Sequence, residues 1–264
     1  MKYIKAIVFL ISISILLQGC TKNQAQVKMI DAGIKPTIAI FSDVPDKVNF
    51  TIVGFTMFGN SFHSSQTNQD FALKIEQYGI KKLIADTKVN IYNLTDSDRN
   101  RLKAIKPGQD GRNSKEYISA FSKWANDKNI DFVAIVSSTS SQHIQYGRAG
   151  TPLGLGILDD SVSGTYLHSV LKIQLVDPKI SEITDYTFAS SFQKIPTIKN
   201  NTSSRFSDND YKTIDNNKLN IISSKLEPLM KSNIEFILKD IGLTRERPGH
   251  TWIDKLPASS DNLF

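Results

Sequence analysis

Hydrophobic and polar positions along the chain follow two periods, one typical of strands and the other of helices. Short runs rich in β-branched and aromatic residues predict strands at residues 37–41, 48–58, 89–94, 130–136, 166–176 and 182–192. The run 130–136 is apolar at nearly every position, which is typical of a central strand that is buried on both faces. Apolar residues at helical spacing predict helices at residues 70–86, 95–105, 114–127 and 211–241.

In the segment 166–176 the apolar residues Leu167, Leu171, Ile173 and Leu175 share one face, and the other face holds His168, Lys172 and Gln174. We therefore expect His168 to be exposed. The turn Asp177-Pro178-Lys179 leads into the segment 182–192, so the two segments predict an antiparallel hairpin.

Polar residues, glycine and proline mark where these elements begin and end. Thr95, and Asn113 or Ser114, offer helix N-caps. The stretches 60–69 and 137–163 are polar or contain several glycines, and they predict loops. Pro228 lacks a backbone N–H inside the last helical segment, so we expect a kink there or two abutting helices. Gly242 is a candidate C-cap.

The order of helices and buried strands predicts an α/β (or α+β) fold, a mixed β-sheet with packed helices and a long C-terminal helix. We divide the chain into a signal peptide (1–19), a tether (20–35), a single α/β domain (36–242) and an irregular C-terminal tail (243–264).

The N-terminus has the pattern of a signal peptide. Lys2 and Lys5 form a basic region, and the apolar run 6–17 is shorter than the roughly 20 residues that a membrane-spanning helix needs. The motif Leu17-Gln18-Gly19-Cys20 follows, and it resembles the lipobox of bacterial lipoproteins. The alternative is a secretory signal or an N-terminal anchor that ends in cysteine by chance.

The lipobox resemblance implies cleavage between Gly19 and Cys20 and a lipid, such as palmitate, on Cys20. Acyl chains would then hold the protein stably on a membrane. Thr21 stands where an Asp commonly marks retention in the inner membrane, so the resemblance favours the outer membrane, with the domain in the periplasm.

The charge pattern argues against nucleic-acid binding. The 32 Lys and Arg exceed the 26 Asp and Glu by six, and loss of Lys2 and Lys5 with the signal would lower the net charge to +4. The two signs are interspersed and arginines are few, which is typical of a solvated surface with at most a mild attraction for anionic lipid or glycan.

No catalytic, metal-binding or nucleotide-binding signature is found in the sequence. The single cysteine excludes an internal disulfide and a Cys-rich zinc site, and no pair of the four histidines has metal-ligand spacing. The serine run 137–141 lacks a G-x-S-x-G context, and the glycine-bearing stretch 147–156 lacks the G-K-[ST] ending of a phosphate loop. We therefore expect no catalytic residue, metal or cofactor.

The glycine-bearing stretch follows the predicted central strand, where open α/β sheets tend to bind ligands. Apolar residues between glycines could form an adaptable contact surface for a partner, or they could pack on the edge of the domain itself. The predicted partner-contact residues are Gly147, Arg148, Gly150, Leu153, Gly154, Leu155 and Gly156.

The order of elements from residue 131 to 192, with Leu175-Val176-Asp177 before the turn, resembles the small α/β modules of bacterial envelope lipoproteins. Examples are the N-terminal domain of the Tol translocation protein and the lipoprotein activators of penicillin-binding proteins. The resemblance implies a non-enzymatic binding or assembly role with an envelope protein as partner. A hydrolase acting on envelope polymers and a subunit of an oligomeric outer-membrane secretion or pore complex are the alternatives.

Overall fold

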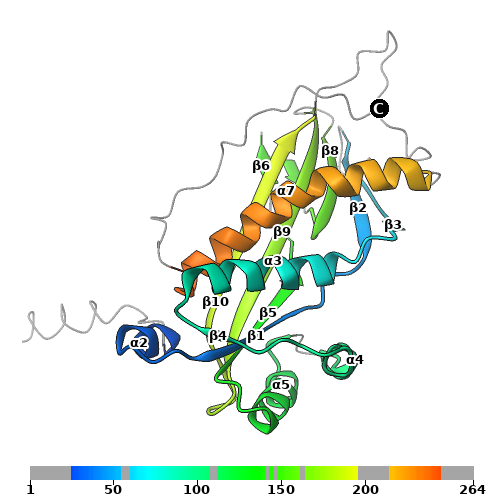
Figure 1. Cartoon of the computed structure of the whole chain (residues 1–264). Helices are drawn as coiled ribbons and strands as arrows, with labels where there is room; N and C mark the ends of the chain where they lie inside the picture. The colour runs from blue at the N-terminus through cyan, green and yellow to red at the C-terminus, as the bar shows by residue number, and fades with distance from the viewer. Residues whose placement is uncertain are drawn as a thin grey trace, which may run out of the picture.

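The computed structural model of the chain describes residues 25–54, 60–107, 112–140, 143–145, 148–150, 152–160, 164–195 and 214–244. In these residues eight strands form one mixed sheet, two more strands pair with each other, and five helices accompany the large sheet (Figure 1). The predicted α/β class, with a mixed sheet and a long C-terminal helix, is confirmed.

The strands are β1 (Thr37–Ser42), β2 (Lys47–Val53), β3 (Ser61–Gln66), β4 (Asn90–Ile91), β5 (Phe132–Ser138), β6 (His143–Gln145), β7 (Arg148–Gly150), β8 (Leu155–Asp160), β9 (Gly164–Asp177) and β10 (Glu182–Lys194). The helices are α2 (Ala25–Asp31), α3 (Phe71–Asp86), α4 (Asp96–Ala104), α5 (Lys115–Asp127) and α7 (Asn216–Asp240).

The sheet consists of two halves that are joined by one long hairpin. The strand order is β3-β2-β8-β9-β5-β1-β4, and β10 pairs with the other edge of β9. The edge of β9 that faces away from β10 pairs with two strands in succession. Residues 164–169 pair with β8 and residues 171–176 pair with β5, so β5 and β8 lie end to end. We call β4, β1 and β5 the lower half and β3, β2 and β8 the upper half, as they are seen in Figure 1.

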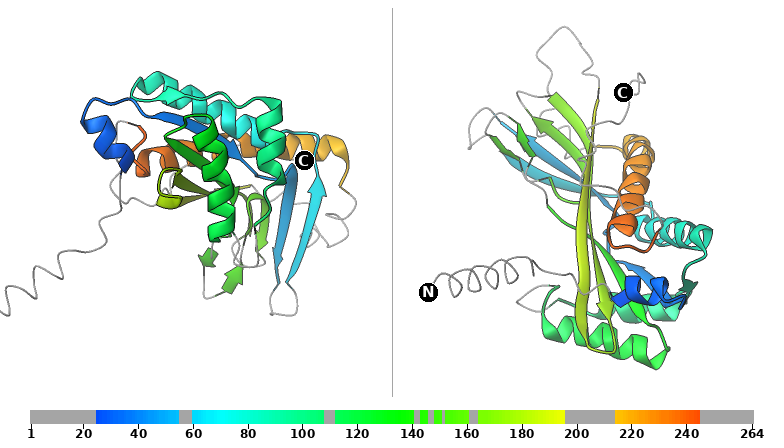
Figure 2. Two further views of the ribbon diagram at one scale, coloured as in Figure 1. Left: turned by 90° about the horizontal axis from the view of Figure 1, so that it is seen from below. Right: turned by 90° about the vertical axis from the view of Figure 1, so that its left-hand side faces the viewer.

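Two backbone hydrogen bonds join the halves where they meet. The Gly154 N–H donates to the Thr139 carbonyl at 3.0 Å, and the Val170 N–H donates to the Gly154 carbonyl at 2.8 Å. The antiparallel pairing of β9 and β10 runs past this junction, which confirms the predicted hairpin. Figure 2 shows these two strands crossing the whole molecule.

Helices α3 and α7 cover the face of the sheet that is in front in Figure 1, which we call the front face. The core under them includes Ile38, Ile40, Ala134, Val136, Ile173, Leu175, Leu226 and Ile237. On the opposite back face, a second core lies under α5 in the lower half of the sheet. It includes Ala39, Phe41, Val133, Ile135, Val176, Phe121 and Trp124.

The prediction of a loop at residues 60–69 is wrong, because β3 forms there. Its residues alternate between half-buried and exposed, and it pairs antiparallel with β2 from Lys47↔Gln66 to Ile52↔Ser61. Backbone pairing with a neighbour holds this edge strand, and such pairing leaves no hydrophobic signature in the sequence. β2 was predicted to reach Phe58, and residues 55–59 lie outside the described residues.

The prediction of an irregular segment at 137–163 is wrong as well, since β6, β7 and β8 form within it. All six residues of β8 are buried, and β8 pairs in parallel with β2. Gly156 permits this close packing, because a Cβ atom there would lie only 1.9 Å from the Asn49 carbonyl oxygen. The formation of β8 therefore depends on pairing with the neighbouring strands and on Gly156, and the sequence has no long apolar run that would predict it.

The C-terminal helix α7 is one helix of 25 residues with Pro228 inside it, rather than two abutting helices. Residues 211–213, which were predicted to start it, lie outside the described residues. The predicted C-cap is confirmed. Gly242 adopts a positive φ of 74°, and the Leu243 N–H donates to the Leu238 carbonyl at 3.0 Å, which is the Schellman pattern.

The segment predicted as a tether contains the helix α2. The Gln26 side chain is fully buried and donates to the Ile241 carbonyl at the end of α7. Ala25, Met29 and Ile30 pack against the front core. Residues 25–35 therefore belong to the folded domain, because α2 covers an end of α7. The signal peptide, Gly19, Cys20 and the tail after Thr244 lie outside the described residues.

Candidate functional site

The back face of the sheet carries exposed aromatic side chains. Phe62 of β3 is 61% exposed, and Tyr186 and Phe188 of β10 are 63% and 47% exposed. Strand register places all three on the back face, since Phe62 pairs with Thr51 while Tyr186 and Phe188 pair with Gln174 and Lys172. No described helix covers them. Tyr186 and Phe188 are two residues apart on one face of β10, whereas Phe62 lies in the edge strand β3, and neighbouring exposed aromatic side chains are typical of contact surfaces.

Four side chains form a row across the middle of this face. The Asp43 N–H donates to the Val136 carbonyl, which places Asp43 beside Ser137. Ser137 pairs with Lys172 of β9, and Lys172 pairs with Phe188 of β10. Side chains directly opposite on neighbouring strands have Cβ atoms about 5 Å apart, so this row of Asp43, Ser137, Lys172 and Phe188 is continuous. We call it the central row.

An ion pair occupies one end of the central row. The Arg112 guanidinium contacts the Asp43 carboxylate through Nε at 2.8 Å and Nη2 at 2.7 Å, both on Oδ2. Burial raises the pKa of Asp43, although the charges of Arg112 and Lys172 oppose the rise. Burial also raises the pKa of the nearby Tyr117 hydroxyl to about 12, with help from the Asp43 charge. Asp43 is therefore a largely buried carboxyl group with two cations near it.

Lys172 is the charged member of the row that forms no direct ion pair within the described residues. Its side chain is half-buried, and its ammonium group has no ion pair or hydrogen bond with any residue that the structure describes. Burial lowers the pKa of Lys172, and the nearby Arg112 charge lowers it further, whereas Asp43 opposes the shift. Because a half-buried cation without a partner is unfavourable, Lys172 is available for a negatively charged group brought by a ligand.

Three buried polar atoms lie around Lys172 without a hydrogen-bond partner among the described residues. They are Asp43 Oδ1, Ser137 Oγ and Gln174 Oε1. Gln174 does use its amide nitrogen, which donates to Asn113 Oδ1 at 2.8 Å. Native proteins pair nearly all such groups, so their concentration at one place distinguishes this region from the rest of the sheet.

The topology explains why these groups meet here. β1 and β5 are parallel, and Asp43 and Ser137 lie at their carboxyl ends. Arg112 and Asn113 come just before α5, whose first turn is capped by Ser114 accepting from the Tyr117 N–H. In open α/β sheets the carboxyl ends of parallel strands, next to helix N-termini, are the usual place for ligands.

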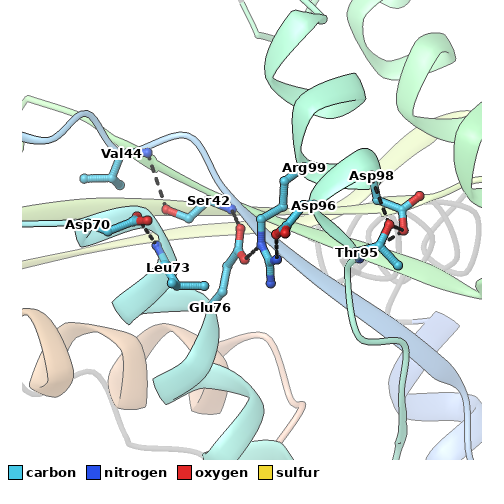
Figure 3. Close-up of polar contacts among 9 residues, drawn as sticks. All are labelled: Ser42, Val44, Asp70, Leu73, Glu76, Thr95, Asp96, Asp98 and Arg99. Carbon is cyan, nitrogen blue, oxygen red and sulfur yellow. Dashed lines mark hydrogen bonds and ion pairs between the residues drawn. The ribbon is translucent and has the colours of Figure 1, made fainter.

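A second polar cluster fixes the backbone next to Asp43 (Figure 3). Glu76 of α3 is only 1% exposed and accepts hydrogen bonds from the Ser42 N–H at 3.1 Å and from Arg99 Nε at 2.7 Å. Burial raises the pKa of Glu76, and the Arg99 hydrogen bond opposes that shift. The cluster joins α3, α4 and β1, and it holds the residue that immediately precedes Asp43.

The predicted partner-contact residues are dispersed by the fold. Leu155 and Gly156 are buried in β8, and Gly154 is buried beside Thr139. Leu153 is 43% exposed, and its carbonyl accepts from Asn49 Nδ2. Arg148 and Gly150 lie in β7, and the side chains of that strand are not described. Gly147 lies outside the described residues. Whether this segment contacts a partner stays a prediction.

His168, expected to be exposed, is fully buried, because β8 and residue Gly154 pack against it. Its Nδ1 lies 3.2 Å from the Gly154 carbonyl oxygen. Within the described residues there is no group of three or more His, Cys, Asp or Glu side chains placed to hold a metal ion. The same part of the chain contains no helix that is both long and apolar enough to cross a membrane.

Comparison with family models finds no match, and comparison with curated proteins also finds none. Among solved structures, the PelC dodecamer from Paraburkholderia phytofirmans aligns with 80% of this chain and 90% of its own at 9% identity and a TM-score of 0.36. The LpoB C-terminal domain from Salmonella enterica aligns with 65% of this chain and 98% of its own at 15% identity and a TM-score of 0.26.

Lipoprotein GNA1162 from Neisseria meningitidis aligns with 72% of this chain and 99% of its own at 10% identity and a TM-score of 0.29. The structural neighbours thus include bacterial lipoproteins. Likenesses at these identities and TM-scores assign no function to this chain.

Proposed function

We propose that this chain is a lipoprotein of the bacterial cell envelope, anchored through lipid on Cys20, whose α/β domain is a non-enzymatic binding module. We place it on the outer membrane, facing the periplasm, with another envelope protein as its partner. The Leu17-Gln18-Gly19-Cys20 motif supports the anchoring. The binding role is supported mainly by one observation, the exposed aromatic ring of Phe188 directly opposite the unpaired cation of Lys172.

The chemistry of this face specifies the kind of partner surface that would fit it. Tyr186 and Phe188 offer apolar area, and Lys172 has Asp43 near it but forms no direct ion pair with any described residue. A protein surface that presents an apolar side chain beside a carboxylate would complement both. Aromatic and cationic side chains of this kind dominate the energetics of many protein interfaces. The predicted contact segment 147–156 adjoins this face through Leu153, which bonds to Asn49.

The hydrolase alternative would need a nucleophile that a substrate can reach. Ser137 lies between Asp43 and Lys172, both of which have shifted pKa values, but its hydroxyl is fully buried. An attacking group must approach the reacting atom to within about 3.5 Å. The burial of Ser137 favours the binding role over hydrolysis.

Photo-crosslinking in whole cells tests the binding role. A photoreactive phenylalanine analogue would be placed at Phe188, and in a matched control at Ile221, which is 45% exposed on α7. We expect a discrete crosslinked envelope protein from position 188 and none from position 221. Equal yields of the same products from both positions, or none from position 188, would contradict the proposed binding face.

Metabolic labelling tests the anchor separately. Cells given an alkyne analogue of palmitate should label the wild-type protein, and Cys20→Ser should abolish both the label and the membrane fraction of the protein. Labelling that persists in the variant would disprove lipid attachment at Cys20 without affecting the result at Phe188.

A further inference from the structure

The helix α2 shortens the link between the proposed lipid anchor and the folded domain. Cys20 and Ala25, the first residue of α2, are separated by residues 21–24 only. Five residue steps reach about 18 Å at full extension, whatever conformation they adopt. If Cys20 carries lipid, the start of α2 must lie within that distance of the bilayer surface.

The helix α2 is held firmly on the domain, so it limits how the domain can lie on the membrane. Gln26 is fully buried and bonded to the carbonyl of Ile241, and Met29 packs on the front core. Figures 1 and 2 place α2 at one end of the molecule, beside the C-terminal end of α7. We call this the anchor end.

The surface of the anchor end combines exposed apolar and basic side chains. Ile34, just after α2, is 53% exposed, and Ile84 in the last turn of α3 is 57% exposed. Lys28, Lys35 and Lys81 are exposed at the same end. The side chain of Asn90 donates to the Lys35 carbonyl, which fixes the segment that carries Ile34 against β4.

Acidic residues at this end offset the lysines only in part. Asp31 is exposed, whereas Asp86 and Asp240 have interaction partners within the protein. Exposed lysines near an anionic bilayer are attracted to its headgroups, and apolar side chains can enter the interfacial region. The composition of the anchor end therefore complements a negatively charged membrane surface.

We infer that the anchor end rests on an anionic lipid bilayer, with Ile34 and Ile84 in the headgroup region and the lysines against lipid phosphates. The inference rests on the proposed lipid at Cys20. It goes beyond that proposal by fixing which surface meets the membrane and which surfaces point away from it.

The orientation has a direct geometrical consequence for the binding face. β9 runs from Gly164 to Asp177, and Asp177 lies at the lower end of the sheet. The turn that follows is held there by the ion pair between Lys179 and Asp131. A strand of 14 residues spans about 43 Å at about 3.3 Å per residue. Lys172, which pairs with Phe188, lies five residues before the end of β9, or about 17 Å along the strand from its lower end. The central row is therefore held above the bilayer, where a partner can approach it.

Site-specific fluorescence quenching tests the orientation. The chain contains one cysteine, and Cys20 would be occupied by lipid, so Ile84→Cys and Ile221→Cys each create a single labelling site. Both isoleucines are exposed on helices, and Ile221 lies near the other end of α7. Each lipidated full-length variant would carry an environment-sensitive fluorophore and be reconstituted in phosphatidylethanolamine–phosphatidylglycerol vesicles that contain a headgroup nitroxide.

We expect quenching at position 84 to exceed that at position 221 at least threefold. Equal quenching at the two positions, or stronger quenching at 221, would overturn the orientation while leaving the anchor intact. Flotation with the vesicles measures the anchor independently. Failure to float would disprove the anchor and the orientation together.

The role of charge is tested with lipid composition and with a lysine variant. Replacing phosphatidylglycerol by phosphatidylcholine, or introducing Lys35→Gln, should reduce quenching at position 84. Lys218→Gln, at an exposed position in the first turn of α7, is the matched control and should have no effect. Quenching that is indifferent to both changes would overturn the electrostatic part of the inference.

Discussion

Lys172 lies directly opposite Ser137 across β9 and β5, and neither side chain has a hydrogen-bond partner among the residues that the structure describes. Ser137 is fully buried, and Lys172 is half-buried. Two polar groups left unpaired side by side are unfavourable for folding, which is typical of residues retained for function rather than for stability.

Replacing Lys172 by Met should therefore increase stability while weakening partner capture. The folded-state pKa of Lys172 is below its ordinary value of 10.5, so the penalty is complete below that folded-state pKa, decreases as the pH rises past it and is gone above the ordinary value. We expect Lys172→Met to stabilise by up to about 1 kcal/mol at pH 7 and less at pH 10 in urea unfolding.

The same variant should reduce crosslinking from position 188 severalfold. Lys194→Met, at an exposed lysine on the same face of the hairpin, is the control and should leave the crosslink unchanged. A Lys172→Met protein that crosslinks normally would exclude Lys172 from the interface.

Asp98 should make a large pH-dependent contribution to stability. Burial opposes its ionisation, but hydrogen bonds from Thr95 and Trp124 lower its pKa to about 2 from the ordinary 3.8. A lowered carboxyl pKa stabilises the fold above the unfolded-state value, and this stabilisation is lost as the pH falls through the folded-state value. The shift corresponds to about 2 kcal/mol at pH 7, falling to about half of that at pH 3.

Urea unfolding of Asp98→Asn at the two pH values measures this contribution. Asp96→Asn is the matched control, since Asp96 is in the same helical turn and its side chain is 97% exposed. Its expected cost is below about 0.5 kcal/mol. Equal costs for the two variants would refute the assignment of the stabilisation to Asp98.

Glu76→Ala should destabilise the protein by about 3 kcal/mol, because it leaves the Ser42 N–H and part of Arg99 without their buried acceptor. The pKa of Glu76 is raised, so protonation of this carboxyl group is more favourable in the folded than in the unfolded protein. The wild type should lose stability as the pH rises through that raised value, and the variant should not. Glu116→Ala, at an exposed position in α5, is the control for unfolding measurements.

Gly156→Ala should prevent β8 from pairing with β2, because the new Cβ atom would meet a backbone carbonyl at 1.9 Å. We expect a cost of about 3 kcal/mol or more, or loss of soluble protein. Gly79→Ala is the comparison, since its Cβ atom would meet only the end of the Ile40 side chain at 2.8 Å. Circular dichroism melting of the two variants should separate them clearly, and similar melting temperatures would show that β8 can shift.

Elements with their own local signal could be predicted from the sequence. The segments of α3 and α5 have apolar residues at helical spacing, and Thr95 and Ser114 are N-caps as expected. The β9–β10 hairpin follows from two segments with strand-like alternation around a proline turn. β3 and β8 were missed, because one is a polar edge strand and the other is buried around glycine and two aspartates.

The central row could not be predicted, because it depends on register. Asp43 follows β1, Ser137 is in β5, and Lys172 and Phe188 are in the β9–β10 hairpin, and each looks ordinary in its own segment. Lys172 could be assigned to the polar face of its strand. That it lacks a partner follows only from knowing which residues lie opposite it.

The junction where β5 ends and β8 begins is a point of the sheet at which new sequence can be inserted into the chain. Thr139 and Gly154 are hydrogen-bonded to each other, so the chain leaves the sheet and returns to it at the same place. Doubling the length of a flexible loop between fixed ends costs only about 0.6 kcal/mol. Within the described residues between them, β6 and β7 form a separate two-stranded pair. New sequence, from a short epitope to a whole reporter domain, can thus be inserted there while the strands of the large sheet keep their register.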